Sequence, residues 1–306
     1  MAELEKTPCN LCGSNDAVLL YRSTLPRQTD RPHNVKALQC TNAGYGIHGP
    51  VVKCQRCGLV YVNPRPNSSD VLHDYEDVVD ELYVEERDGR VLTFQRHLRP
   101  LQRIAGQPDG KRLLDVGCHI GVFVDVAQQH GWDAWGVEPS HWAAEQAQAA
   151  GLKVVNGTLA TSGFPDASFD VITLWDVIEH VPNPKRELLQ VHRVLKPGGV
   201  VVIHTIDIES PFARIMGHHW PWLMEMHLYY FSPRTLRCML EDIGFEVIHS
   251  SPQGRYLRLG YLISRLQGYS RPLYRLLDAI VTRLNLRGIA VPINLGDLFT
   301  MYARKP

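Results

Sequence analysis

The sequence of 306 residues lacks an excess of charge of either sign, because 32 Lys and Arg balance 32 Asp and Glu. A protein that binds polyanions in general is usually more basic, so the composition gives little support to a nucleic-acid partner. No stretch approaches the roughly eighteen uninterrupted apolar residues of a membrane span. Internal repeats and low-complexity tracts are also missing, and 44% hydrophobic residues permit a sizeable core. A disordered or collagenous chain is therefore excluded.

The first residues also lack the features of a secretory signal. MAELEKTPCNLCGSND contains acidic residues and cysteines where a basic and then an apolar stretch would be needed. Seven cysteines, an odd number, argue against a secreted disulfide framework. We therefore expect a cytoplasmic protein.

Composition divides the chain into three parts. Residues 1–66 hold five of the seven cysteines and many turn formers. This predicts a small module that must be stabilised by something other than a hydrophobic core. Residues 67–110 form a polar helical linker. Residues 111–306 alternate short β-branched runs with helical segments, a pattern that predicts an α/β domain with a mostly parallel sheet. Within this part, residues 251–287 form a basic, amphipathic helical insertion.

Two Cys-x-x-Cys pairs stand 41 residues apart, Cys9 with Cys12 and Cys54 with Cys57, and each is followed by glycine. Four thiolates in two such turns suit one tetrahedral zinc ion with a structural role. Buried free thiols or a redox pair are the alternatives, although a redox pair usually lies near a βαβ unit. Three further potential ligands lie between the pairs: His33, Cys40 and His48.

The segment RLLDVGCHIG places an acid at the end of a strand and glycines in the turn into a helix. Gly117 and Gly121 permit close approach of backbone to a ligand, and the helix N-terminus favours an anionic group. The next strand ends on Glu138, where a carboxylate can accept hydrogen bonds from two ribose hydroxyls. A nicotinamide dehydrogenase would need G-x-G-x-x-G, which this turn lacks.

Five segments in order resemble the motifs of class I S-adenosylmethionine-dependent methyltransferases: LLDVGCHIGVF, GVEPS, FPDASFDVITLWDVIEHVPNP, LLQVHRVLKPGGVVVIHT and HLYYFSPRTLRCMLEDIGFEV. The resemblance covers residues 111–250. It implies a Rossmann-like seven-stranded sheet whose final strand is antiparallel, and S-adenosylmethionine as the methyl donor. The residues it assigns to the donor site are Asp115, Gly117, His119 and Gly121 around methionine, Glu138 on ribose, Gly157, Thr158 and Leu159 near adenine, and Trp175 near the methyl group.

His119 stands where this family usually has glycine. Its side chain must point away from the donor, contact the methionine carboxylate or obstruct the pocket. Obstruction would leave a catalytically inactive binding or scaffold protein, which is one alternative function.

The cysteine-rich segment, with CQRCGLVYVNPRP, is similar to the zinc-ribbon leader of bacterial methyltransferases that modify sugars, cell-surface glycans or secondary metabolites. The resemblance implies a small-molecule acceptor of one of these classes. A zinc-containing RNA methyltransferase is the second alternative, but residues 1–66 carry only eight Lys and Arg against four Asp and Glu.

His227 is the first candidate for a base that removes the acceptor proton. Sugar C-methyltransferases have a Tyr-His-Glu-His run here, and only its final His is matched, so O-methylation is slightly favoured over C-methylation and N-methylation stays open. His180 is the second candidate. With Asp176 and Glu179 it resembles the run that binds a divalent ion in ubiquinone-pathway O-methyltransferases.

The insertion 251–287 contains seven arginines and one acid. Its amphipathic segments suit peripheral contact with an anionic membrane, a diphosphate substrate or another subunit, or they simply cover the sheet. The sequence leaves the oligomeric state open.

Overall fold

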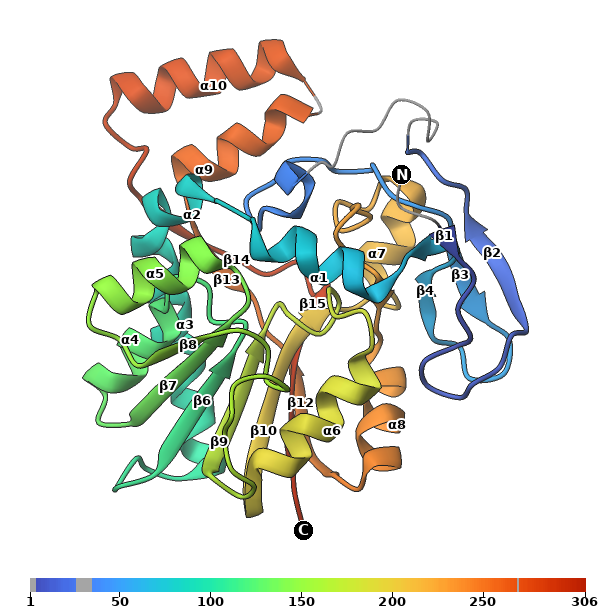
Figure 1. Ribbon diagram of the computed structural model, residues 1–306. Helices are drawn as coiled ribbons and strands as arrows, with labels where there is room; N and C mark the ends of the chain where they lie inside the picture. The colour runs from blue at the N-terminus through green and yellow to red at the C-terminus, as the bar shows by residue number, and fades with distance from the viewer. Residues whose placement is uncertain (1–3, 26–34, 269) are drawn as a thin grey trace.

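The computed structural model describes residues 4–25, 35–268 and 270–306. Its centre is a seven-stranded sheet with the order β12-β15-β10-β9-β6-β7-β8 (Figure 1). Strands β8, β7, β6, β9 and β10 pair in parallel, whereas β15 is antiparallel to both of its neighbours. The predicted Rossmann-like sheet with an antiparallel final strand is confirmed. The strands are β6 (Arg112–Val116), β7 (Asp133–Glu138), β8 (Val154–Asn156), β9 (Phe169–Trp175), β10 (Leu195–Ile206), β12 (Glu246–Pro252) and β15 (Leu298–Arg304).

Helices cover both faces of this sheet. Side chains of α6 (Pro184–Val194) and α8 (Pro233–Ile243) pack into one core, and those of α3 (Arg87–Ala105), α4 (Val122–Gln129) and α5 (His141–Ala149) into another. Local chemistry sets the ends of α8. Ser232 caps it through a capping box with Thr235, Pro233 occupies its first turn, and Gly244 ends it with φ 104°.

The cysteine-rich segment forms a second, antiparallel sheet with the order β11-β4-β3-β2. Its strands are β2 (Ala17–Tyr21), β3 (Val51–Cys54), β4 (Val60–Val62) and β11 (Tyr229–Tyr230). Strand β11 belongs to the loop that joins β10 to α8, far from the module in sequence. The module is therefore completed by a strand from the part assigned to residues 111–306, and its sheet extends beyond the predicted boundary at residue 66.

The remaining elements lie around the carboxyl ends of the parallel strands (Figure 1). The linker contributes short helices, and the insertion contributes two helices and one strand, which pairs with a strand that follows the insertion. Among the described residues, no helix has both the length and the apolar character needed to cross a bilayer. These elements are β1 (Leu4–Glu5), η2 (Val35–Leu38), β5 (Arg65–Pro66), α1 (Ser68–Glu76), α2 (Glu81–Glu85), α7 (Pro211–Met216), η3 (Gly217–His219), β13 (Arg255–Arg258), α9 (Leu259–Ser264), η4 (Arg265–Gly268), α10 (Arg271–Arg283) and β14 (Ala290–Ile293).

A buried carboxylate holds the loop between α7 and β11 against the sheet. The indole nitrogens of Trp220 and Trp222 both donate hydrogen bonds to Oδ2 of Asp297, over 3.0 and 2.8 Å. Asp297 and Trp220 are buried. Two indole donors would remain unpaired without this oxygen, and unpaired buried donors are costly.

We expect Asp297→Ala to lower the free energy of unfolding by about 2 kcal/mol, because it leaves the two indole donors without an acceptor. Asp297→Asn, which keeps one acceptor oxygen, should lose clearly less. Denaturant unfolding of the two variants and the parent measures the difference. Equal losses in both variants would show that the acceptor oxygen is not what matters.

Candidate functional site

A cavity of about 610 Å³ lies at the carboxyl ends of the parallel strands. Gly117 follows β6, and Glu138 and Trp175 end β7 and β9; all three line it. Linker helices and the insertion close other sides, for example through Arg90 and Arg255. Ligand sites of open α/β sheets form at this edge, so the cavity is the candidate site.

The glycines of the turn after β6 pack closely against side chains of the protein. Gly117 has φ 68°, and a Cβ added there would lie 2.8 Å from a methyl carbon of Val177. Gly121, with φ 76°, begins α4 against Leu152. Asp115 is buried, where its Oδ1 accepts a hydrogen bond from Thr173 Oγ1 over 2.7 Å, and burial raises its pKa to about 8. Gly117 lines the cavity, whereas Asp115 and Gly121 shape the turn from behind it.

Glu138 joins this turn to the next strand. Its Oε2 accepts a hydrogen bond from the His119 backbone N–H over 2.8 Å, and its Oε1 accepts one from the Ser140 N–H over 2.9 Å. Burial raises the pKa of Glu138 to about 7, against the lowering effect of these two bonds. Each carboxylate oxygen can accept a further hydrogen bond, so the side chain remains able to bind a ligand hydroxyl.

His119 occupies the left-handed backbone region, with φ 51°, and its ring stacks on Tyr83 with centroids 3.6 Å apart. The guanidinium carbon of Arg90 lies 3.5 Å from the centroid of the same tyrosine ring. Two groups this close cannot share one face, so Tyr83 is sandwiched between them. Burial, and then the charge of Arg90, lower the pKa of His119 to about 3, which keeps the imidazole neutral. The ring is thus part of the cavity wall, held against Tyr83.

The segment after β8 also lines the cavity, through Gly157, Thr158 and Leu159. Gly157 has φ 135°, and its N–H donates a hydrogen bond to the Glu138 carbonyl over 2.9 Å. This bond sets the segment beside the end of β7. The structure therefore gathers Gly117, His119, Glu138, Gly157–Leu159 and Trp175 around one space.

On the acceptor side predicted from the sequence, His180 and His227 face each other with ring centroids 4.8 Å apart. Nδ1 of His180 lies 3.0 Å from the Met226 carbonyl oxygen, and Nδ1 of His227 lies 2.6 Å from that of Trp222. A carbonyl only accepts, so each Nδ1 carries the proton and each Nε2 keeps a lone pair. Burial lowers both pKa values, that of His227 to about 3 with a contribution from His180. Both rings are neutral.

Two acids beside these rings, half-buried Asp176 and buried Glu179, differ in charge. Burial alone would raise the pKa of Asp176, but the charges of Arg255 and then His204 bring it to about 2. Arg255 Nη2 lies 3.0 Å from Asp176 Oδ1. Burial, and then the charge of Asp176, raise the pKa of Glu179 to about 8. At neutral pH Asp176 is ionised and Glu179 is largely protonated.

The potential metal ligands near these acids differ from the set that the resemblance implied. Glu179, His180 and His227 present ligand atoms within 4.8 Å of one another. Asp176 instead pairs with Arg255, and Nε2 of His204 lies 3.7 Å from its Oδ1. The structure thus places His227, and not Asp176, with Glu179 and His180 as potential metal ligands.

Sequence reasoning missed several residues of this cavity, including Tyr83, Arg90, His204 and Arg255. The one available signal was His204, a titratable residue inside the apolar strand VVVIHTI. Tyr83, Arg90 and Arg255 reach the cavity from the linker and the insertion, and nothing in their local sequence distinguishes them.

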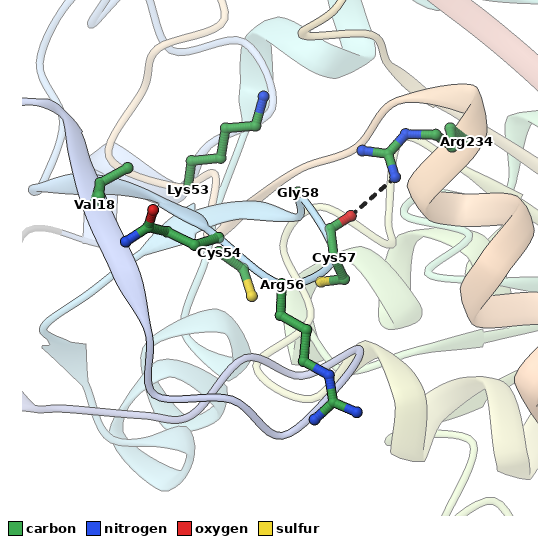
Figure 2. Close-up of a pocket in the computed structure, with 8 residues that line it drawn as sticks. Val18, Lys53, Cys54, Arg56, Cys57, Gly58 and Arg234 are labelled. Carbon is green, nitrogen blue, oxygen red and sulfur yellow. Dashed lines mark hydrogen bonds between the residues drawn. The ribbon is translucent and has the colours of Figure 1, made fainter.

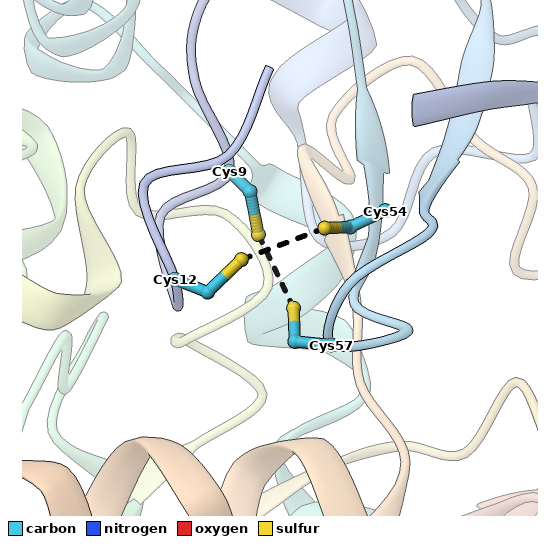
Figure 3. Close-up of side chains that lie close together, drawn as sticks. All are labelled: Cys9, Cys12, Cys54 and Cys57. Atoms are coloured by element: carbon cyan, nitrogen blue, oxygen red, sulfur yellow. Dashed lines mark hydrogen bonds between the residues drawn. The ribbon is translucent and has the colours of Figure 1, made fainter. Parts of the chain in front are cut away.

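The four cysteines of the two pairs come together at one end of the second sheet (Figure 3). Sγ of Cys9 lies 3.4 Å from that of Cys57, and Sγ of Cys12 lies 3.6 Å from that of Cys54. Tetrahedral zinc with Zn–S bonds of about 2.3 Å separates its sulfurs by about 3.8 Å. All four are free thiols whose ligand atoms lie within 4.8 Å of one another, so the residues fit one ion.

Both cysteine turns adopt the same backbone conformation. Gly13, with φ 71°, donates its N–H to the Cys9 carbonyl over 2.8 Å, and Gly58, with φ 82°, donates to the Cys54 carbonyl over 2.9 Å. Left-handed backbone at these positions explains the glycine after each pair. Among the three further potential ligands, Cys40 lies instead near Asp80 and His119, His48 contacts the Gly49 carbonyl, and His33 lies outside the described residues.

Arg234 of α8 ties the second cysteine turn to the central domain. A pocket of about 440 Å³ on the surface of this turn is lined by Lys53, Gly58 and Arg234, among others (Figure 2). Arg234 Nη1 donates a hydrogen bond to the Cys57 carbonyl oxygen over 3.0 Å. Arg234 thus anchors the module, and the residues of this pocket lie apart from those of the large cavity.

A family model described as a methyltransferase domain matches residues 83–250. The chain is 31% identical over 105 residues to a ubiquinone biosynthesis O-methyltransferase of Methylococcus capsulatus, covering 32% of this chain and 44% of that protein. It is 30% identical over 156 residues to a probable S-adenosylmethionine-dependent methyltransferase of Mycolicibacterium smegmatis, covering 50% and 59%. The chain thus spans about half the length of these relatives.

Among solved structures, a possible histamine N-methyltransferase of Thermotoga maritima has a TM-score of 0.49 and 22% identity. This match covers 74% of the present chain and 94% of the other.

We expect the purified protein to contain one zinc ion per chain and Cys9→Ser to lose it. Without the ion, the thermal midpoint should fall by about 5 °C or more, or roughly 2 kcal/mol in a chain of this size. Elemental analysis and thermal unfolding measure the two effects. Cys238→Ser, which replaces an exposed free thiol, serves as the matched control and should keep both zinc and midpoint. A zinc-free parent with four reduced thiols would refute the assignment.

Burial lowers the pKa of His97 to about 4, although a hydrogen bond to the Gly254 carbonyl raises it in part. An unfolded histidine titrates near 6.5. Below that pH the unfolded chain binds a proton that the folded chain does not, so stability falls as pH falls toward 4. We expect the loss of unfolding free energy between pH 7 and pH 5 to be smaller in His97→Gln by about 2 kcal/mol. Denaturant unfolding at both pH values measures it; the same loss in parent and variant would contradict the burial argument.

Proposed function

The chain belongs to the methyltransferase domain family, and from this premise we propose that it transfers a methyl group from S-adenosylmethionine to a small-molecule acceptor. The acceptor class we propose is a sugar, a glycan precursor or a secondary metabolite, with O-methylation ahead of C-methylation. Free thiols at all described cysteines suit a reducing compartment, so we place the reaction in the cytoplasm.

One observation carries this proposal. Among the described residues, thirteen buried side-chain nitrogen and oxygen atoms lack a hydrogen-bond partner, and eight of them belong to residues that line the large cavity. Buried polar groups in native proteins are normally paired, so a cluster of unpaired ones marks a space meant for a polar ligand. The eight residues are Tyr75, Arg90, His97, His119, Trp175, His204, Arg255 and Arg265.

The donor half of the cavity would bind S-adenosylmethionine through groups that the sequence predicted and through Arg90, which it did not. Glu138 has acceptor capacity for the ribose hydroxyls, and Gly157–Leu159 lines the cavity where adenine would lie. His119 is neutral, so the positive charge for a methionine carboxylate comes from Arg90, the cation beneath Tyr83. The bound donor supplies an electrophilic methyl group on a sulfonium.

The acceptor half would hold the hydroxyl that is methylated. His227 presents an Nε2 lone pair, and its fixed Nδ1–H bond to Trp222 sets the ring orientation, as a proton acceptor requires. Its lowered pKa makes it a weak base. Ionised Asp176, which tends to raise that pKa, would support the imidazolium once a proton is taken.

A divalent ion fits the same residues. Glu179, His180 and His227 offer one carboxyl group, which an ion would deprotonate, and two imidazole nitrogens with free lone pairs, a donor set suited to zinc or Fe(II) with open coordination positions. There it would supply Lewis acidity to an acceptor oxygen. Sensitivity of turnover to a chelator, which the four-thiolate site would resist longer, separates this role from that of a simple base.

Titration calorimetry with S-adenosylmethionine tests the donor site. We expect binding by the parent and affinity about 10- to 100-fold lower for Glu138→Ala, because hydrogen bonds to a charged group are lost. Glu145→Ala, an exposed glutamate on α5, is the matched control. No binding by a folded, zinc-loaded parent would favour an obstructed pocket and an inactive scaffold.

Turnover is then measured as S-adenosylhomocysteine formed with panels of nucleotide sugars, glycan precursors and phenolic metabolites. With an acceptor found, His227→Ala should lower kcat by about 10²- to 10⁴-fold while the donor affinity is kept. His73→Ala, on the exposed face of α1, should leave both unchanged. Full turnover by His227→Ala would remove this residue from the chemistry.

A further inference from the structure

Helix α10 presents an uncovered apolar stripe. Leu273, Leu276, Ile280 and Leu284 recur at helical spacing on one side, and they are 44%, 60%, 44% and 58% exposed. The helix packs against α9 and η4 through another side, which includes buried Val281 (Figure 1). Large exposed apolar groups on one stripe mark a contact surface and not a solvated face.

The same helix carries positive charge that the protein does not neutralise. Arg271, Arg275 and Arg283 form no ion pair within the described part of the chain. Asp278, the one acid of the insertion, forms an ion pair with Arg287. Three other arginines of the insertion contact groups outside it: Arg255 pairs with Asp176, and Arg258 and Arg265 donate hydrogen bonds to the carbonyls of Glu85 and Thr41. The uncompensated cations therefore lie on α10, where the apolar stripe is.

The apolar stripe and the unpaired arginines together favour one kind of partner for this surface. A second copy of the chain would bring another set of unpaired arginines against the first, and like charges at a shared interface repel. A leucine-rich stripe on a helix whose other sides carry arginines suits the boundary between acyl chains and anionic headgroups, where the apolar side inserts and the guanidinium groups reach phosphates.

We infer that α10 docks the protein on an anionic lipid bilayer. The helix lies in the plane of the interface, with Leu276 and Ile280 buried among acyl chains and Arg275 and Arg283 in the headgroup layer. The same insertion contributes Tyr256, Tyr261 and Arg265 to the cavity wall, so the docked surface and the cavity belong to one structural unit. This inference is independent of the proposed function, because it concerns binding alone.

Vesicle flotation of the full-length, zinc-loaded protein tests it. We expect the protein to float with vesicles of equal parts phosphatidylcholine and phosphatidylglycerol and to remain in the dense fraction with phosphatidylcholine alone. Leu276→Asp with Ile280→Asp should weaken the association by about tenfold or more. Arg275→Gln and Arg283→Gln should each weaken it by about fivefold.

All these positions are exposed, so folding should be unaffected, and thermal unfolding checks this. Ile215→Asp on α7 is the matched control, since Ile215 is 83% exposed but lies outside the insertion, and it should float like the parent. Failure of the parent to float, or equal flotation with neutral vesicles, would overturn the inference. A concentration-dependent dimer that Leu276→Asp with Ile280→Asp abolishes, without flotation, would assign the stripe to a second copy instead.

Discussion

Much of this structure depends on the pairing of β11 with β4. Tyr229 and Tyr230 complete the sheet of the cysteine-rich module, and the Val62 N–H donates to the Leu228 carbonyl just before them. The Leu228 and Tyr229 N–H groups both donate to the Glu179 carbonyl. His227 is therefore held between the cysteine-rich module on one side and the segment with Glu179 and His180 on the other. The module thus supports the part of the cavity wall that contains His227.

The electrostatics of the cavity follow from this enclosure. Burial keeps His119, His180 and His227 neutral and Glu179 largely protonated, whereas Asp176 stays ionised because Arg255 neutralises it. Arg90 contributes one cation to the cavity wall, and Asp176 with Arg255 forms a charged pair among neutral imidazoles. Polar atoms without partners surround it, so a ligand can gain hydrogen bonds without first displacing internal ones.

The fold was predictable because its signals are local. Alternating strands and helices, the glycine turn at Gly117 and the two Cys-x-x-Cys pairs each depend on neighbours within a few residues. The site was predictable only where a motif carried it, as with Glu138. The contact of Asp176 with Arg255 joins residues 79 positions apart, and Tyr83 reaches His119 from a linker whose sequence shows only helical character. Such contacts depend on how elements pack, which periodicity does not specify.

The direction of the strands explains the part of the cavity wall that no sequence motif marked. Strand β12 is antiparallel to β15, and β15 is antiparallel to β10, so β12 runs in the same direction as the parallel strands. Its carboxyl end therefore lies at the same edge of the sheet as the cavity. Any segment inserted between β12 and β15 must leave and return at that edge. The insertion 251–287 therefore leaves and returns at the cavity edge, and this strand direction explains why Arg255 lies in the cavity wall although nothing in its local sequence marks it.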